Sequence, residues 1–188
     1  MKFRTPFFWQ PSADVLKILQ SNTPGKFFVI AMNYLIWFFL FYISYLLIKS
    51  DTNVFWQLFI ATLVGEFVEK YGKSHALWPR PLYKRKDPTP FGLVDHWYQT
   101  GSFPSGHTIK ATFFLLFLLQ YPVFPVTTYI LIVVPLLVFR VIVGFHYPID
   151  MFGGAFVGLF IWLSSRSIFL PEPLTNFVRI IFNFIFRV

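Results

Sequence analysis

The chain alternates between long apolar runs and short segments that contain polar residues or proline. The clearest run, residues 27–48, holds no charged residue and is long enough to cross a hydrocarbon core of about 30 Å. Further apolar segments cover residues 54–71, 105–121, 126–143 and 149–164. This pattern predicts an all-α integral membrane helix bundle with five transmembrane helices.

Both ends of the chain have a different pattern. In residues 174–188, polar residues recur at spacings of three and four, so they share one face of a helix. They are Asn176, Arg179, Asn183 and Arg187. Residues 12–20 form a second short helix in our interpretation, preceded by Phe7, Phe8 and Trp9. We expect these N- and C-terminal amphipathic helices to lie in the membrane interface.

The longest polar stretch separates the second and third apolar segments. Residues 72–104 contain several prolines and basic residues and no apolar stripe, so we predict a long irregular loop. With five spans, this loop, the turn near residues 144–148 and the N-terminus share one side of the membrane. The turns at residues 49–53 and 121–125 lie on the other side, with the C-terminus.

The composition supports the membrane interpretation. The 188-residue chain is 56% hydrophobic and 22% aromatic, and only 13% of its residues are charged, whereas globular chains have about 25% charged residues. The net charge of +8 fits nucleic acid, an anionic lipid surface or a phosphate-bearing substrate. The hydrophobicity argues against nucleic acid. With no cysteine, disulfides, thiolate metal sites and cysteine nucleophiles are excluded.

Ionisable and small polar residues gather at the ends of the predicted helices on one side of the membrane. They are Lys73, Arg80, Ser105, Gly106, His107, Arg140, His146 and Asp150. Fixed cations and the N–H groups at a helix start stabilise charge on phosphate oxygens. A neutral imidazole can attack phosphorus, and a second imidazole can protonate the leaving oxygen. The set therefore indicates phosphoryl transfer.

These residues fall in three spaced motifs. Residues 73–81 read K-x6-R-P, residues 104–107 read P-S-G-H, and residues 140–150 read R-x5-H-x3-D. In this order the motifs resemble the signature of the type 2 phosphatidate phosphatase (PAP2) superfamily, which includes vanadium haloperoxidases and acid phosphatases. Phe139 stands where the family usually has serine. Membrane members often have six spans, so the resemblance makes six the alternative to five.

The resemblance implies a single membrane phosphatase domain, residues 1–188, with a motif core at 73–150 and an active-site loop at 72–104. It makes His146 the nucleophile that becomes phosphorylated, Asp150 the residue that orients it, and His107 the general acid. The substrate phosphate would be bound by Lys73, Arg80, Ser105, Gly106 and Arg140. The family requires no metal, and we expect no cofactor.

We therefore expect hydrolysis of a lipid phosphomonoester or diphosphate through a phosphohistidine intermediate. The candidate substrates are undecaprenyl diphosphate, phosphatidylglycerol phosphate and the 1-phosphate of lipid A. A lipid phosphotransferase and a non-catalytic lipid-phosphate binder are the alternatives. The expected partners are the lipid substrate and the bilayer, with no nucleic acid.

Sidedness and three further charges have more than one interpretation. The positive-inside rule places the active-site face in the cytoplasm, but several of those cations are phosphate ligands in our interpretation. We follow the resemblance, which implies the bacterial inner membrane with the site facing the periplasm. The basic run 84–86 is expected to face lipid headgroups, with binding of a second phosphate or a sugar of the substrate as the alternative. Glu66 and Glu69 are expected to pair with Lys70 or Lys73.

Overall fold

The computed structural model describes residues 6–12, 14–75, 77–87, 89 and 99–187. Over these residues the regular structure is helical, and the only β pairing is an isolated bridge between Pro79 and Gly101. The helices are η1 (Pro6–Phe8), α1 (Asp14–Leu19), α2 (Thr23–Ser50), α3 (Asn53–Ser74), α4 (Pro81–Arg85), α6 (Gly106–Gln120), α7 (Val126–Ile142), α8 (Pro148–Ser165) and α9 (Glu172–Phe186). The predicted all-α fold is confirmed.

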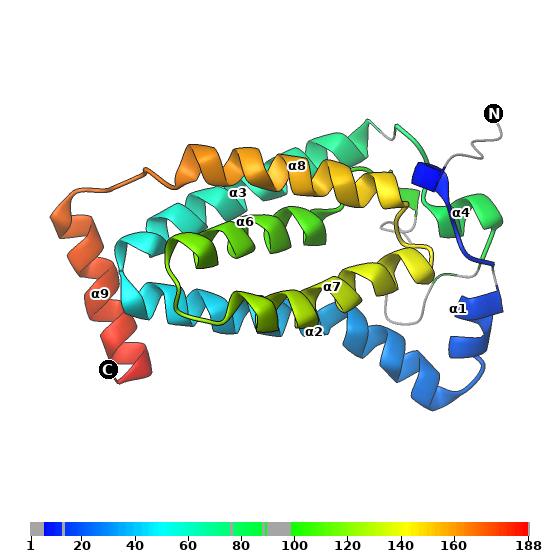
Figure 1. Ribbon diagram of the computed structural model, residues 1–188, viewed down its shortest axis with the longest axis horizontal. Coiled ribbons are helices and arrows are strands. Elements are labelled where there is room, and N and C mark those ends of the chain that lie inside the picture. Colours follow the sequence, from blue (N-terminus) through cyan, green and yellow to red (C-terminus); the bar gives the residue numbers. More distant parts are fainter. Residues whose placement is uncertain (1–5, 13, 76, 88, 90–98, 188) are drawn as a thin grey trace.

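Five helices run along the long axis of the molecule: α2, α3, α6, α7 and α8 (Figure 1). Helix α6 packs against the other four and is the centre of the bundle. Helix α9 lies across one end, while η1, α1 and α4 gather at the opposite end (Figure 1). The turn between α7 and α8 reaches this second end, as the predicted topology requires.

Helices α6 and α8 approach each other most closely at two glycines. A Cβ atom added to Gly154 would stand 2.7 Å from the carbonyl oxygen of Ser105. One added to Gly158 would stand 2.6 Å from the carbonyl oxygen of Ile109. Small residues of this kind let helix backbones meet. This close contact brings the start of α6 beside the start of α8.

The apolar residues form an inner core and an outer apolar coat. The main core joins α2, α3, α6, α7 and α8, and its fully buried members include Ile43, Ile109 and Phe117. Many large apolar side chains point outward instead; Phe38 and Phe41 of α2 are 74% and 67% exposed. An exposed apolar surface of this extent is typical of a protein that contacts other apolar material, such as lipid.

Two described helices, α2 and α8, are long and apolar enough to cross a membrane by length and composition. Helices α6 and α7 have only 15 and 17 residues. Helix α3 carries Glu66, Glu69, Lys70 and Lys73 toward its end. The five helices expected as spans are all present, and among the described helices α2 and α8 meet these criteria.

The predicted irregular loop 72–104 is partly wrong over the residues that the structure describes, and its residues 76, 88 and 90–98 lie outside them. Helix α3 continues to Ser74, and α4 forms a further helical turn within the loop. Proline is favoured in the first turn of a helix, which explains why α4 begins at Pro81. The predicted terminal helices are confirmed as α1 and α9.

Candidate active site

His146 lies in the turn between α7 and α8 and is 1% exposed. Its Nδ1 is 2.9 Å from the carbonyl oxygen of Ser102 and 3.5 Å from Oδ2 of Asp150. Because a carbonyl oxygen only accepts, the neutral ring carries its proton on Nδ1 and keeps a lone pair on Nε2. Burial lowers the pKa of His146 well below its usual range, and Arg80 and Arg140 lower it further. The ring is therefore neutral at pH 7.

Asp150 stands in the first turn of α8 and is fully buried. Its Oδ2 accepts a hydrogen bond of 2.7 Å from the backbone N–H of Tyr147, which caps the helix. Its Oδ1 accepts one of 2.9 Å from the indole N–H of Trp78. Both oxygens are thus held in place, and the carboxylate is positioned to stabilise positive charge on the His146 ring.

Arg80 joins three segments of the site. Its Nη1 donates a hydrogen bond of 3.1 Å to the carbonyl oxygen of Phe145, and its Nη2 donates one of 3.2 Å to Oγ1 of Thr100. The bridge between Pro79 and Gly101 holds the neighbouring backbone. Burial, reinforced by the charge of Arg140, lowers the pKa of Arg80 to about 9. The fully buried guanidinium remains charged at pH 7.

Arg140 and His107 supply two further polar groups from α7 and α6. Arg140 bonds through Nη1 to the side chain of Asn33, and its Cζ lies 5.3 Å from the centre of the Phe145 ring. The His107 ring packs edge-on against Trp37, with the ring centres 5.1 Å apart. Within the part of the chain that the structure describes, Nε of Arg140 and Nε2 of His107 are buried without a hydrogen-bond partner. Each atom therefore keeps an unused capacity for a hydrogen bond.

Ser105 and Gly106 form the start of α6. Oγ of Ser105 accepts from the backbone N–H of Thr108 at 3.4 Å and from its hydroxyl at 3.0 Å. The backbone N–H of Ser105 donates to the carbonyl oxygen of Asp150 at 3.1 Å, which ties α6 to α8. A Cβ atom on Gly106 would meet the carboxylate of Glu69. This helix N-terminus is suited to an anion.

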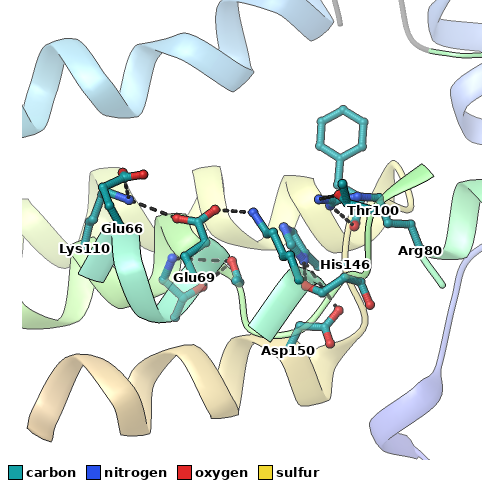
Figure 2. A network of polar contacts seen from close by, with 12 residues as sticks. Glu66, Glu69, Arg80, Thr100, Lys110, His146 and Asp150 are labelled. Atoms are coloured by element: carbon teal, nitrogen blue, oxygen red, sulfur yellow. Dashed lines mark hydrogen bonds and ion pairs between the residues drawn. The ribbon is translucent and has the colours of Figure 1, made fainter. Parts of the chain in front are cut away.

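Four charged residues of α3 and α6 form a chain of ion pairs (Figure 2). Glu69 pairs with Lys73 through Oε1 and with Lys110 through Oε2, the latter at 3.1 Å. Lys110 also pairs with Glu66 at 2.7 Å. The predicted pairing of Glu69 with Lys73 is confirmed, whereas Glu66 pairs with Lys110 and not with Lys70 or Lys73. Lys73 is thus the last residue in a series of ion pairs that contains two cations and two carboxylates, so the charges of the series balance.

The basic run 84–86 separates into two environments. Lys84 and Lys86 are exposed, whereas Arg85 turns inward. Arg85 pairs with Asp87 at 2.6 Å and donates to the carbonyl oxygen of Pro11 at 2.8 Å. Arg85 therefore ties α4 to Asp87 and to the backbone at Pro11, whereas the expected contacts of the run with lipid or substrate stay predictions.

The structure brings the predicted residues to one end of the bundle and adds partners that the sequence analysis missed, including Asn33, Thr100, Trp78, the Ser102 carbonyl and Lys110. Trp78 lies inside the first motif, but nothing in its position indicates an indole bond to Asp150. The Ser102 partner of His146 is a backbone carbonyl, which leaves no side-chain signal. Lys110 had a signal, because it is an ionisable residue within an apolar segment.

Comparison with known families identifies the chain's relatives. The model of the PAP2 superfamily matches residues 54–172, which include all three motifs. Comparisons with curated proteins and with solved structures give no match. Since the match covers more than half of the chain, the protein belongs to the PAP2 superfamily, whose members are generally phosphatases that act on phosphoester substrates.

Proposed function

We propose that this protein is an integral membrane phosphatase that hydrolyses a lipid phosphomonoester or diphosphate through a phosphohistidine on His146. The observation that carries the proposal is the Ser102 carbonyl 2.9 Å from Nδ1 of His146, because it leaves Nε2 with the lone pair. A buried neutral imidazole beside Arg80 and Arg140 is a nucleophile with fixed positive charge around its target.

In the first step, Nε2 of His146 attacks phosphorus and the bond to the leaving oxygen breaks. His107 gives its proton to that oxygen, and the negative charge of the bound phosphate favours the protonated form of this ring beforehand. Arg80, Arg140 and Lys73 hold the phosphate oxygens. Asp150 stabilises the positive charge that forms on the phosphorylated ring.

In the second step, water attacks the phosphorus of the phosphohistidine and the P–N bond breaks. His107, now neutral, takes the proton from water, so that both histidines return to their starting states. Inorganic phosphate leaves. The balance of the two steps requires only this chain, the lipid and water.

A lipid substrate is proposed because the site lies at one end of an apolar bundle. In this proposal α2, α3, α6, α7 and α8 cross the bacterial inner membrane, and the site faces the periplasm. A lipid can then place its phosphate beside His146 while its tail stays in the bilayer. Undecaprenyl diphosphate, phosphatidylglycerol phosphate and the 1-phosphate of lipid A are the candidates.

The test measures phosphate release from these three lipids by the purified protein in detergent, with EDTA present. We expect release by the native chain and a loss of at least about a thousandfold in H146A, since removing a catalytic nucleophile has effects of this order. H75A is the matched control, because His75 is an exposed histidine at one of the unspecified positions of the first motif and has no proposed role in the reaction. Radiolabelled phosphate should be trapped on the native protein after an acid-free quench.

The alternatives give different results in the same assay. Phosphate found on an acceptor lipid, with little released into solution, would indicate a phosphotransferase. Tight lipid-phosphate binding without release from any of the three lipids would indicate a non-catalytic binder. Equal activity of H146A and the native chain would reject the phosphohistidine mechanism.

A further inference from the structure

Glu69 is a largely buried carboxylate beside Lys73, one of the cations that the proposed reaction needs. Its side chain is 15% exposed and pairs with both Lys73 and Lys110. Lys73 is a proposed phosphate ligand, whereas neither Glu69 nor Lys110 belongs to the three motifs. Lys73 therefore has to leave Glu69, at least in part, before it can bind a substrate phosphate.

The position of Glu69 is that of an anion at the start of α6. Its carboxylate packs directly on Gly106, where even a Cβ atom would have no room. Gly106 is the first residue of α6, so the carboxylate lies against the end of the helix that attracts negative charge. A substrate phosphate bound by Lys73 and this helix start would compete with Glu69 for the same positive groups.

Lys110 gives Glu69 a second partner that does not depend on Lys73. It is 2% exposed and lies 5.0 Å from the centre of the Trp37 ring, with Glu66 on its other side. If Lys73 turns to a phosphate, Glu69 keeps its ion pair with Lys110 and is not left as an unpaired buried charge, which would be costly. Figure 2 shows Glu69 between Lys110 and the His146 side of the site.

We infer that Glu69 is an internal anion that holds Lys73 in the free enzyme, is displaced from Lys73 by the substrate phosphate, and displaces the product phosphate in turn, while Lys110 retains it throughout. This inference rests on the proposed function. Glu69 and Lys110 act through Lys73 and are positioning residues. The exchange lowers the affinity for phosphate and so limits inhibition by the product.

The test is the inhibition constant of inorganic phosphate, together with KM and kcat, for the native chain, E69Q and E66Q. Glutamine keeps the size of the side chain but loses the charge that holds Lys73.

We expect E69Q to bind phosphate about tenfold more tightly, the scale of one charge-assisted hydrogen bond, with a lower KM and a lower kcat. E66Q is the matched control, because Glu66 pairs with Lys110 and makes no ion pair with Lys73; its inhibition constant should stay within about twofold. Weaker or unchanged phosphate binding in E69Q overturns the inference.

A double-mutant cycle with Lys110 separates this role from simple charge removal. In K110M, Lys73 is the only remaining ion-pair partner described for Glu69, so phosphate competes less well for Lys73. We expect K110M to bind phosphate about fivefold more weakly than the native chain, and the same substitution to have little effect in the E69Q background. Equal effects in both backgrounds would show that Lys110 acts on phosphate directly and would contradict the inference. If E69Q does not fold, the phosphate affinity of K110M tests the inference on its own. Phosphate binding by K110M that is as tight as in the native chain, or tighter, overturns the inference. Lipid hydrolysis that depends on His146, with unaltered phosphate affinity in E69Q, would reject the inference and leave the proposed function intact.

Discussion

At the scale of single residues, the Asp150 carboxylate is the group whose position the site controls most tightly. It is fully buried, and each oxygen has its own N–H donor, from Trp78 and from the backbone of Tyr147. A buried carboxylate that loses a donor either moves or pays a desolvation cost. Since it lies 3.5 Å from Nδ1 of His146, a small movement changes the stabilisation of the phosphorylated ring.

The first residue-scale prediction concerns Trp78. W78F removes the indole N–H but keeps an aromatic ring against Phe8 and Phe103, whose centres are each 5.2 Å from it. We expect kcat to fall about tenfold with KM nearly unchanged, because hydrogen bonds to charged groups contribute about 1.5–3 kcal/mol. Steady-state kinetics on the preferred lipid phosphate provides the measurement.

Trp56 is the matched control for this change. It lies among apolar residues of α2, α3 and α9 at the end of the bundle opposite the site. W56F should leave both kinetic constants within about twofold of the native values, as is usual for substitutions away from special features. A change in KM alone for W78F would mean that Trp78 acts in binding and not through Asp150.

Residue identity was predicted better than residue contact. The motifs named the residues that meet at the site, because their spacing along the chain carries that information. The partners came from folding: Trp78, the Ser102 carbonyl and Lys110 reach the site only when α3, α6 and α8 pack together. Pairwise charge rules along one helix found the bond between Glu69 and Lys73 and missed the one across helices.

At the scale of elements, the contact between α6 and α8 aligns two of the three motifs. The second motif begins α6 and the end of the third lies in α8. The backbone bond from Ser105 to Asp150 forms beside the close approach at Gly154. The spacing between these helices therefore sets the distance between the helix N-terminus and the nucleophile.

The element-scale prediction is that G154A disturbs this spacing. A Cβ atom there would lie 2.7 Å from the Ser105 carbonyl oxygen and 2.9 Å from Cβ of Thr108, so the helices must separate. Overpacking of this kind costs about 1–3 kcal/mol. We expect a lower melting temperature and a lower kcat for G154A. Intrinsic fluorescence of the protein in detergent measures the melting temperature, and phosphate release measures kcat.

Gly65 on α3 is the control for G154A. A Cβ atom on Gly65 meets its nearest neighbour, Ile109, at 3.5 Å, an ordinary contact distance. G65A should therefore keep the native melting temperature to within a few degrees or raise it, because alanine favours the helix. Similar losses in both variants would show that α6 and α8 are no more sensitive to added volume than α3.

The helices themselves were predicted from hydrophobic pattern, with ends that differ from the structure by only a few residues. The prediction was wrong at the start of residues 72–104, because charged residues interrupt the apolar pattern over the last turn of α3. Glu69 and Lys73 are separated by one helical turn and pair on its surface, which is a helix signal of a different kind from an apolar stripe. The five residues of α4 are too few to show helical periodicity, so Pro81, which is favoured at a helix start, was the only indication of this helix in the sequence.

At the scale of the whole molecule, the two ends of the bundle differ in chemistry. One end carries the site and α4, whereas the other carries the C-terminal end of α2 and the transverse helix α9 (Figure 1). Lys84 belongs to α4 and Lys49 to the last turn of α2, and both are exposed. Helix α9 places Tyr45 of α2 against Phe182 and Phe186, with ring centres 5.6 and 4.9 Å apart. Val178 of α9 is buried, whereas Ile180 and Phe184 are 67% and 85% exposed, so α9 presents apolar side chains both to the bundle and outward.

The whole-molecule prediction is that these two ends lie on opposite sides of the inner membrane. The chain contains no cysteine, so K84C and K49C each introduce a single reactive thiol without background. With the site facing the periplasm, an impermeant maleimide should label K84C in intact spheroplasts and label K49C only after lysis. The reverse pattern would place the site in the cytoplasm, as the positive-inside rule favours. Labelling of both thiols in intact spheroplasts would mean that α3 does not cross the membrane, because α3 is the long helix between the two positions in the chain, and would contradict the prediction.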